Sequence, residues 1–349
     1  MTLRSLRLVT GLVLMAFVTG HMLNLMLGMH SLAAMESWRP WLMGPWRSIA
    51  GQGLLVCSAL IHLALGVYAL SARRSLAMSK TDVVQLCLGL ATPPLLLNHA
   101  IVMHMAGEVS PNFDATFGQM LAVYWSFSPG YAFQQLGVVM VVWIHAAVGL
   151  YSWLVLKPVW KRIGGMVLPV LFAVPILALL GFAEAGREVL EKLASDPAWR
   201  EHISANLRRV VAVTDPLNAM QSRLLWGYGI LVIVAVGVFG ARVLRERVRR
   251  VTVGYDGGAS AQGRRGLSIL ELSRLNDVPH AHVCSGRGRC GTCRVRIEAG
   301  AGSLSPMSDV ERATLARVEA GAGERLACQA RVTGSGVVAT RLLAPWATV

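Results

Sequence analysis

Charged side chains are scarce in this sequence. Asp, Glu, Lys and Arg together make up 15% of its 349 residues, whereas 54% of the residues are apolar. This composition excludes a single soluble globule and is typical of a membrane protein that carries a soluble part. The chain also lacks a nucleotide-binding glycine loop, a flavin fingerprint and a catalytic triad. We therefore expect no catalytic domain in this chain, and any substrate chemistry would occur elsewhere.

The apolar residues are concentrated in blocks before about residue 246. Each block has about 20 residues, enough for a helix to cross the hydrocarbon core of a bilayer. We predict six membrane-spanning helices, over residues 6–28, 49–70, 83–105, 132–156, 165–186 and 223–244. The chain is accordingly divided into a membrane domain, residues 1–246, and a soluble domain, residues 247–349.

Basic residues mark one side of the predicted helix bundle. Its loops carry Arg4, Arg7, Arg73, Arg74, Lys80, Lys157, Lys161, Arg162 and the basic run 242–250. Loop 106–131, on the other side, contains no Lys or Arg. The positive-inside rule then places both termini in the cytoplasm of a bacterial-type inner membrane. Loop 187–222 carries charges of both signs and is expected to form a helical cap; a cleaved N-terminal signal peptide is the less favoured alternative.

The net charge of +14 raises the question of a nucleic-acid partner. Much of the positive charge lies in the predicted cytoplasmic loops, where it would face anionic lipid headgroups. Membrane topology therefore explains the charge, and we expect the lipid bilayer, not nucleic acid, as the partner.

Two stretches of the predicted membrane domain share one pattern. Residues 61–68 and 144–151 both read I-H-x-A-x-G-x-Y, in the second and fourth spans. The first and third spans also carry a histidine each, His21 and His99. This repetition predicts a duplicated helical hairpin with one histidine in each helix.

The depths of these histidines predict two pairs, His21 with His99 and His62 with His145. An ionisable residue inside a span is costly and usually marks a functional site. Neutral imidazoles on facing helices of a four-helix bundle suit axial ligation of haem iron. A glycine four residues after each histidine of the second pair leaves room for a flat porphyrin. We therefore predict two bis-histidine b haems; hydrogen-bonded core histidines are the alternative.

The arrangement resembles the dihaem cytochrome b anchor of succinate dehydrogenases and fumarate reductases, which pairs histidines of four helices in this crossed order. The resemblance covers the first four spans and implies quinol oxidation or quinone reduction near one haem. The last two spans contain no histidine. A transporter built on the duplicated hairpin is an alternative; it would need a broken helix, for which Pro93–Pro94 is the candidate within the repeat.

Four further residues of the membrane domain have side chains that can bind metals. His30 and His104 are expected near the outer surface as spare candidates, with His104 on a different helix face from His99. Cys57 and Cys87 lie inside predicted spans and are interpreted as packing residues.

The soluble domain alternates short strands and helices. We predict strands at 251–255, 292–297 and 337–343, helices at 267–275 and 308–320, and a cysteine-bearing segment at 325–332. The order of strand, helix, ligand loop, strand, helix and strand indicates a small α+β domain with a β-grasp fold.

Four cysteines in this domain are predicted metal ligands: Cys284, Cys290, Cys293 and Cys328. Disulfides are disfavoured in the reducing cytoplasm, and zinc sites usually use two C-x2–4-C knuckles. Here one C-x2-C motif follows a cysteine at x5, and the fourth cysteine is distant, which favours a [2Fe–2S] cluster. Structural zinc remains the alternative.

The x5 spacing resembles the adrenodoxin-like branch of ferredoxins, over residues 251–343, and the R-L-A-C-Q segment around the fourth cysteine fits the same branch. Gly286, Gly288 and Gly291 leave the loop free to wrap around sulfide with its N–H groups close to sulfur. The loop departs from acidic carrier ferredoxins in its arginines, which are Arg287, Arg289, Arg294 and Arg296. We expect these charges to raise the cluster potential. They would dock the loop on an acidic partner or on the haem domain; the alternative is a solvated basic face near anionic lipid.

The two parts together resemble the N-terminal half of bacterial membrane-bound class III adenylate cyclases, in which a cyclase domain follows the ferredoxin. This chain stops at Val349 without the metal-binding aspartate pair of a cyclase. Our prediction is a membrane electron-transfer or redox-sensing protein that links a quinone pool, two b haems and a cytoplasmic cluster. The alternatives are the regulatory anchor of a cyclase, or a transporter-like bundle with a zinc-binding tail. The expected partners are quinone and a cytoplasmic redox protein or cyclase domain; a homodimer is left open.

Overall fold

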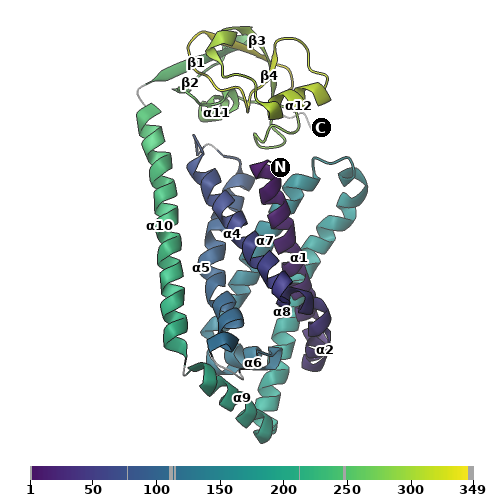
Figure 1. The fold of residues 1–349 in the computed structure, drawn as a ribbon. Coiled ribbons are helices and arrows are strands. Elements are labelled where there is room, and N and C mark those ends of the chain that lie inside the picture. Colours follow the sequence, from purple (N-terminus) through teal and green to yellow (C-terminus); the bar gives the residue numbers. More distant parts are fainter. Residues whose placement is uncertain are drawn as a thin grey trace. The chain divides into compact units, whose positions relative to one another are not determined.

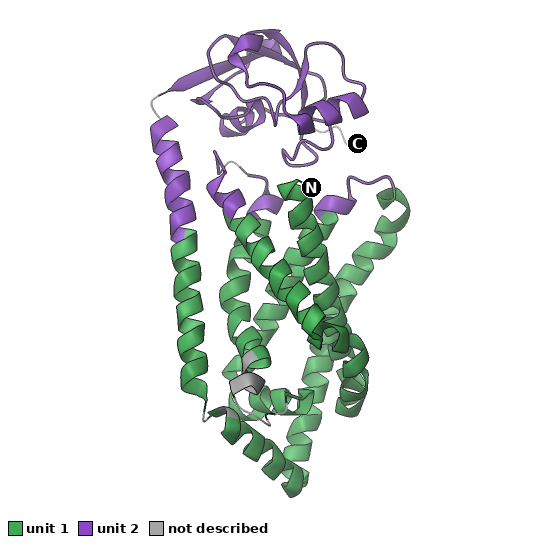
Figure 2. Ribbon diagram, in the orientation of Figure 1, with its two compact units in different colours: residues 1–67, 84–151, 159–232 green, residues 68–83, 152–158, 233–349 purple. Residues whose placement is uncertain are grey.

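The computed structural model describes residues 2–76, 78–109, 113, 115–211, 213–246 and 249–344. It contains two compact units (Figure 2). Unit 1 comprises residues 1–67, 84–151 and 159–232, and unit 2 comprises residues 68–83, 152–158 and 233–349. The domain boundary predicted after residue 246 falls at residues 247 and 248, which lie outside the described part, as do parts of the predicted loop 106–131.

Unit 1 is helical (Figure 1). Its α-helices are α1 (Leu3–Met26), α2 (Leu32–Leu42), α3 (Gly44–Arg47), α4 (Ile49–Ser71), α5 (Lys80–Val109), α6 (Phe117–Ala122), α7 (Gly130–Leu154), α8 (Trp160–Ser195), α9 (Pro197–Val211) and α10 (Thr214–Glu246). Four of them, α4, α5, α7 and α10, extend into unit 2 at one end. Short helical turns follow α1 (η1, Leu27–Met29) and α6 (η2, Val123–Phe127).

Six of these helices are long and apolar enough to cross a membrane. Within the described residues they run over Leu3–Met29, Ile49–Ser71, Lys80–His104, Gly130–Leu154, Trp160–Ser195 and Thr214–Glu246. Each contains most of one predicted span. The largest difference is α8, which continues through the charged segment after residue 186 because that segment also consists mainly of helix-forming residues. The predicted cap therefore contains the end of α8 as well as α9.

Helices α1 and α8 cross at glycines. A Cβ atom on Gly181 would lie 2.0 Å from the carbonyl oxygen of Leu25, and one on Gly28 would lie 2.3 Å from that of Gly181. No other residue type fits such a close backbone approach without moving a helix. The crossing joins α8 to the histidine-bearing helix α1.

Two prolines inside helices leave carbonyl groups that side chains of other helices satisfy. A helical proline removes the hydrogen bond to the carbonyl four residues before it. For Pro94 that carbonyl is Leu90, which accepts from the Tyr228 hydroxyl at 2.7 Å. Similarly, the Leu171 carbonyl, four residues before Pro175, accepts from Trp143 Nε1 at 2.7 Å. Since α5 remains helical through Pro93–Pro94, the helix break that a transporter would need is not found there.

Unit 2 contains a mixed five-stranded sheet of order β2-β1-β5-β3-β4. The strands are β1 (Arg250–Tyr255), β2 (Ser260–Arg264), β3 (Arg294–Ala299), β4 (Glu324–Leu326) and β5 (Val337–Arg341). Strands β1 and β5 are parallel, and the other neighbours are antiparallel. Helices α11 (Ile269–Leu275) and α12 (Asp309–Arg317) lie close to the predicted positions, whereas β2 and β4 were not predicted.

The core of this part forms between the sheet and α11. Val253 and Val295 of the sheet, and Leu272 of α11, are fully buried in one apolar cluster that also includes Cys293 and Cys328. Ser268 begins α11 with a capping box, in which its side chain accepts from the backbone N–H of Glu271 and Glu271 accepts from the backbone of Ser268. Two of the predicted ligands are thus part of the hydrophobic core.

Candidate functional site

The four predicted cysteine ligands lie on two segments of unit 2. Three occur in the loop that precedes β3, and Cys328 follows β4. Cys284, Cys293 and Cys328 are buried, and Cys290 is half-buried. The segment with Cys328 is held beside β3 because the Ala327 N–H donates to the Cys293 carbonyl at 2.9 Å.

The cysteines form two hydrogen-bonded pairs, Cys284 with Cys290 and Cys293 with Cys328. The hydrogen bond from Cys290 lowers the pKa of the Cys284 thiol to about 5, and backbone N–H groups of the loop act in the same direction. The hydrogen bond from Cys293 likewise lowers the pKa of Cys328. Within the described residues, no group of three or more His, Cys, Asp or Glu side chains is arranged for one metal ion. Two cysteine pairs fit a two-iron cluster better than a single tetrahedral zinc, which needs four ligands together.

The loop around these cysteines depends on left-handed backbone conformations. Gly286, Gly288 and Gly291 have φ values of +87°, +65° and +80°, and Ser285 has +54°. The Gly288 carbonyl also accepts from the buried Thr314 hydroxyl at 2.6 Å, which ties the loop to α12. The three glycines expected to give the loop its freedom therefore adopt conformations that other residues rarely take.

Gly291→Ala is expected to destabilise the ligand loop. An alanine there would have to adopt a positive φ, which costs about 1–2 kcal/mol. Its Cβ would also lie 2.9 Å from Val318 Cγ1. We expect the temperature at which the cluster's visible circular dichroism is lost to fall by about 5–15 °C. Gly302→Ala is the control, because no atom lies within 4 Å of its added Cβ. Equal temperatures for the two variants would contradict this account of the loop.

The arginines near the cysteines are mostly paired within unit 2. Arg287 donates to Asp82 at 3.0 Å. Arg294 and Arg296 lie 3.3 Å and 3.9 Å from Glu324. The predicted basic face is therefore partly neutralised, a feature that the spacing of charges along the sequence does not reveal.

A buried ion pair holds the segment that carries Cys328. Glu311 of α12, with 1% of its side chain exposed, accepts from Arg325 Nε at 2.8 Å and Nη2 at 3.0 Å. It also accepts from the Leu326 backbone N–H at 2.9 Å. Glu311 thus fixes two residues that closely precede a predicted ligand. Sequence reasoning missed this role, and no local signal marks Glu311, because Asp309 and Arg312 of the same helix are charged as well.

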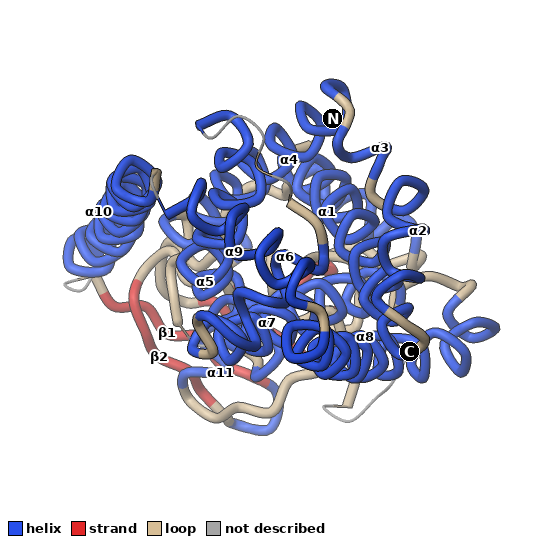
Figure 3. The backbone as a smooth tube through the Cα atoms, turned by 90° about the horizontal axis from the view of Figure 1, so that it is seen from below, coloured by secondary structure: helices blue, strands red, loops and turns tan. Residues whose placement is uncertain are grey.

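The four predicted histidines lie in two pairs in unit 1. The ring centres of His21 and His99 are 6.1 Å apart, and those of His62 and His145 are 6.2 Å apart. The rings are inclined by 51° in the first pair and 88° in the second. Helices α1, α4, α5 and α7, which carry them, are grouped when unit 1 is viewed from below (Figure 3).

Each histidine of the second pair has its Nδ1 fixed by a carbonyl group of a neighbouring helix. His62 Nδ1 lies 3.1 Å from the Arg7 carbonyl oxygen, and His145 Nδ1 lies 3.2 Å from that of Gln85. A carbonyl acceptor at Nδ1 selects the tautomer whose Nε2 carries no proton. In His145 that nitrogen lies 3.4 Å from Gln85 Nε2. In the first pair, His99 Nδ1 lies 3.2 Å from the Tyr124 hydroxyl.

Two glycines adjoin the imidazoles of the second pair. A Cβ on Gly11 would lie 2.9 Å from His62 Cε1, and one on Gly89 would lie 2.8 Å from His145 Cε1. The sequence assigns a different role to Gly66 and Gly149, which are expected to leave room for a porphyrin. A Cβ on Gly66 would meet no atom within 4 Å, and one on Gly149 would lie 3.3 Å from Gln85 Nε2. The glycines that approach the imidazoles are therefore on the partner helices.

The remaining candidates of unit 1 are all exposed. His30 and His104 are exposed. Cys57 and Cys87 are also exposed, which corrects their interpretation as packing residues. Their helices are long and apolar enough to span a membrane, so outward-facing positions on them would meet lipid and not other helices.

Comparison with known proteins identifies the C-terminal part. Residues 256–333 match the family described as the 2Fe-2S iron-sulfur cluster binding domain. Chlorosome protein I of Chlorobaculum tepidum is 38% identical over 79 residues, which are 23% of this chain and 32% of that protein. The chain thus spans about a third of that relative's length.

A second relative is matched over most of its length. The 2Fe-2S ferredoxin-5 of Aquifex aeolicus is 34% identical over 83 residues, which are 23% of this chain and 84% of that protein. Together with the paired cysteines and the mixed sheet, this match supports a [2Fe–2S] cluster as the cofactor of unit 2. Through its C-terminal region, the chain belongs to the [2Fe–2S] ferredoxin family.

Proposed function

We propose that this protein transfers electrons between a membrane quinone pool and its own [2Fe–2S] cluster through two b haems. Cys284, Cys290, Cys293 and Cys328 would hold the cluster, and the His21–His99 and His62–His145 pairs would each hold one haem. The termini would face the cytoplasm, as the distribution of basic residues predicts. A ferredoxin domain joined to helices of membrane-spanning length already indicates electron transfer at a membrane.

The separation within each histidine pair carries the proposal. Two imidazoles that held one iron between them through bonds of about 2.0–2.1 Å would have ring centres about 6 Å apart. The two pairs have 6.1 Å and 6.2 Å. The alternative, core histidines that hydrogen-bond across helices, shares the Nδ1 contacts of His62 and His145 with backbone carbonyls, so the ring separation is what distinguishes the two hypotheses. The Nδ1 contacts favour Nε2 as the ligand atom in both.

Equivalent contacts also support a duplicated hairpin. Arg7 and Gln85, Gly11 and Gly89, and His21 and His99 each differ by 78 positions. Arg7 and Gln85 supply the carbonyl groups at Nδ1 of the second pair. Gly11 and Gly89 adjoin its imidazoles. His21 and His99 are themselves predicted ligands. We infer that α1–α4 and α5–α7 are two copies of one haem-binding hairpin.

When bound, the haems would supply reversible one-electron carriers at two depths of the bundle. The protein's part is to fix the imidazoles and to keep the rings neutral. The Arg7 and Gln85 carbonyls hold the rings of the second pair, and Phe17 stacks on His21 with ring centres 6.2 Å apart. These contacts limit ring rotation before any metal binds.

The purified full-length protein tests the proposal in two steps. We expect a pyridine haemochrome assay to give two b haems per chain, and iron and acid-labile sulfide analysis to add two irons and two sulfides. Reduced quinol should then reduce the haems first and the cluster afterwards. Absence of haem would disprove the cytochrome part, and a cluster that stays oxidised beside reduced haem would disprove transfer in this direction.

A further inference from the structure

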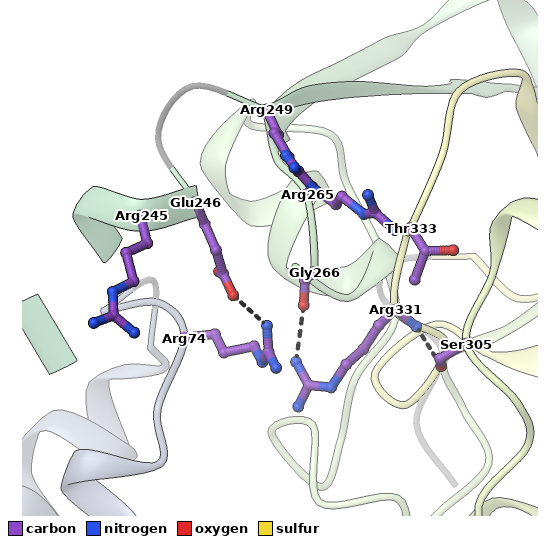
Figure 4. Close-up of a pocket in the computed structure, with 9 residues that line it drawn as sticks. All are labelled: Arg74, Arg245, Glu246, Arg249, Arg265, Gly266, Ser305, Arg331 and Thr333. Carbon is purple, nitrogen blue, oxygen red and sulfur yellow. Dashed lines mark hydrogen bonds and ion pairs between the residues drawn. The ribbon is translucent and has the colours of Figure 1, made fainter. Parts of the chain in front are cut away.

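A cavity of about 400 Å³ in unit 2 is lined by arginines (Figure 4). Its lining consists of Arg74, Arg245, Glu246, Arg249, Arg265, Gly266, Ser305, Arg331 and Thr333. These residues come from the segment after α4, from the end of α10, from the position directly before β1, and from loops of the ferredoxin domain. The cavity therefore lies where three separate stretches of unit 2 meet.

The charges around this cavity are unbalanced. Five guanidinium groups surround one carboxylate, Glu246, which pairs with Arg74 at 2.6 Å. Arg331 donates to the Gly266 carbonyl at 3.1 Å and lies 3.8 Å from Glu271. Among the described residues, no carboxylate pairs with the other three arginines. Like charges gathered in this way repel one another unless an anion lies between them.

The close approach of these stretches is built into the chain. Gly266 has a φ of +86°, and a Cβ there would lie 2.5 Å from Nη1 of Arg74. Arg264 donates to the Arg74 carbonyl at 2.6 Å, and Arg242 donates to that of Ser71 at 3.0 Å. The backbone that presents Arg74 is thus held by two arginines outside the cavity, which leaves the lining arginines for a ligand.

The chemistry of the lining favours phosphate. Guanidinium groups bind phosphate oxygens through paired, charge-assisted hydrogen bonds, and the hydroxyls of Ser305 and Thr333 can donate further ones. The volume falls in the range of small-ligand sites and exceeds the need of a single small ion. Arg245 and Glu246 end α10, directly after its apolar stretch, and headgroups of anionic lipids meet spanning helices at such ends.

We propose that this cavity binds a phosphate-bearing anion, either a phosphodiester lipid headgroup or a soluble diphosphate. The anion bridges the segment after α4, the end of α10 and the ferredoxin domain, and it neutralises their arginines. This function is separate from electron transfer and requires neither the haems nor a redox-active cluster.

Pyrophosphate binding to the full-length protein tests the site. Calorimetric titration is made in nanodiscs of phosphatidylcholine alone. The triple variant Arg245→Gln/Arg249→Gln/Arg265→Gln is expected to bind at least about tenfold more weakly than the wild type, since each lost charge-assisted hydrogen bond contributes that order of affinity. The control Arg208→Gln/Arg223→Gln/Arg312→Gln removes the same charge from exposed positions and should bind like the wild type.

Nanodiscs that also contain phosphatidylglycerol distinguish the two sources of phosphate. If the lipid headgroup is the natural ligand, phosphatidylglycerol should compete with pyrophosphate and weaken its binding to the wild type. If a soluble anion is the natural ligand, phosphatidylglycerol should leave pyrophosphate binding unchanged. Should the triple variant fail to fold, Arg265→Gln alone is used, with about fivefold weaker binding expected. Equal pyrophosphate affinity of wild type and cavity variant would overturn the proposal. So would an absence of pyrophosphate binding combined with equal retention of phosphatidylglycerol in native mass spectra.

Discussion

Replacing His62 with alanine is expected to halve the haem content of the purified protein. The imidazoles of His62 and His145 have ring centres 6.2 Å apart, so both would bind one iron. Loss of either ligand should release that haem and leave the one between His21 and His99, because a different pair of helices holds it. The pyridine haemochrome assay, normalised to protein, measures the ratio directly. His202→Ala is the control, since His202 is exposed and belongs to α9.

Double variants distinguish shared ligation from general damage to the bundle. His62→Ala/His145→Ala should retain as much haem as either single variant, because the two residues serve one haem. His62→Ala/His99→Ala, which takes one ligand from each pair, should retain almost none. If the two double variants retain equal amounts of haem, the assignment of the pairs is wrong.

The helical part could be predicted in detail because long apolar runs have few alternatives. A stretch of about 20 apolar residues has to form a helix in lipid, where every backbone polar group needs an internal partner. The depth of a histidine in such a helix then follows from counting, and the structure brings together the two pairs expected from depth. The end of α8 was not predicted, because charge ends an apolar run without ending a helix.

What counting could not supply is the identity of neighbours across helices. Gly11 and Gly89 approach the imidazoles of the second pair, yet nothing in either local sequence marks them as facing a histidine. Their role follows only from the packing of α1 on α4 and of α5 on α7. The same limit applies to the Arg7 and Gln85 carbonyls, since a backbone acceptor leaves no signature in residue type.

In the ferredoxin domain, the sequence predicts four cysteine ligands but not the contacts that support them. Cysteine spacing is a local property of the chain and points to a cluster by itself. Strand β2 is short and polar, and β4 has three residues, so neither shows a clear alternation of apolar side chains. Glu311 and Arg325 are 14 positions apart and meet only when α12 packs beside β4.

Arg325→Ala is expected to cause the largest loss of stability in the ferredoxin domain. In the native protein 1% of the Glu311 side chain is exposed, and the carboxylate would remain buried in the variant. Without Arg325, it would still accept a hydrogen bond from the backbone N–H of Leu326 but would have lost its charged partner. Breaking a buried ion pair by removing one partner costs about 3–5 kcal/mol. For a domain of this size that corresponds to a fall of more than about 10 °C in the temperature of cluster loss. Visible circular dichroism of the full-length protein follows this transition.

The exposed pair on the same helix provides a matched control. Arg312 and Asp309 of α12 have 59% and 95% of their side chains exposed. Arg312→Ala should therefore lower the free energy of unfolding of the domain by less than about 1 kcal/mol. Glu311→Gln/Arg325→Ala should be more stable than Arg325→Ala alone, because no uncompensated charge remains buried while the amide can still accept from Leu326. If the double variant is the less stable of the two, burial of the Glu311 charge is not the cause. The effect would then come from lost packing of Arg325, and the ion pair would have no special part in holding Cys328.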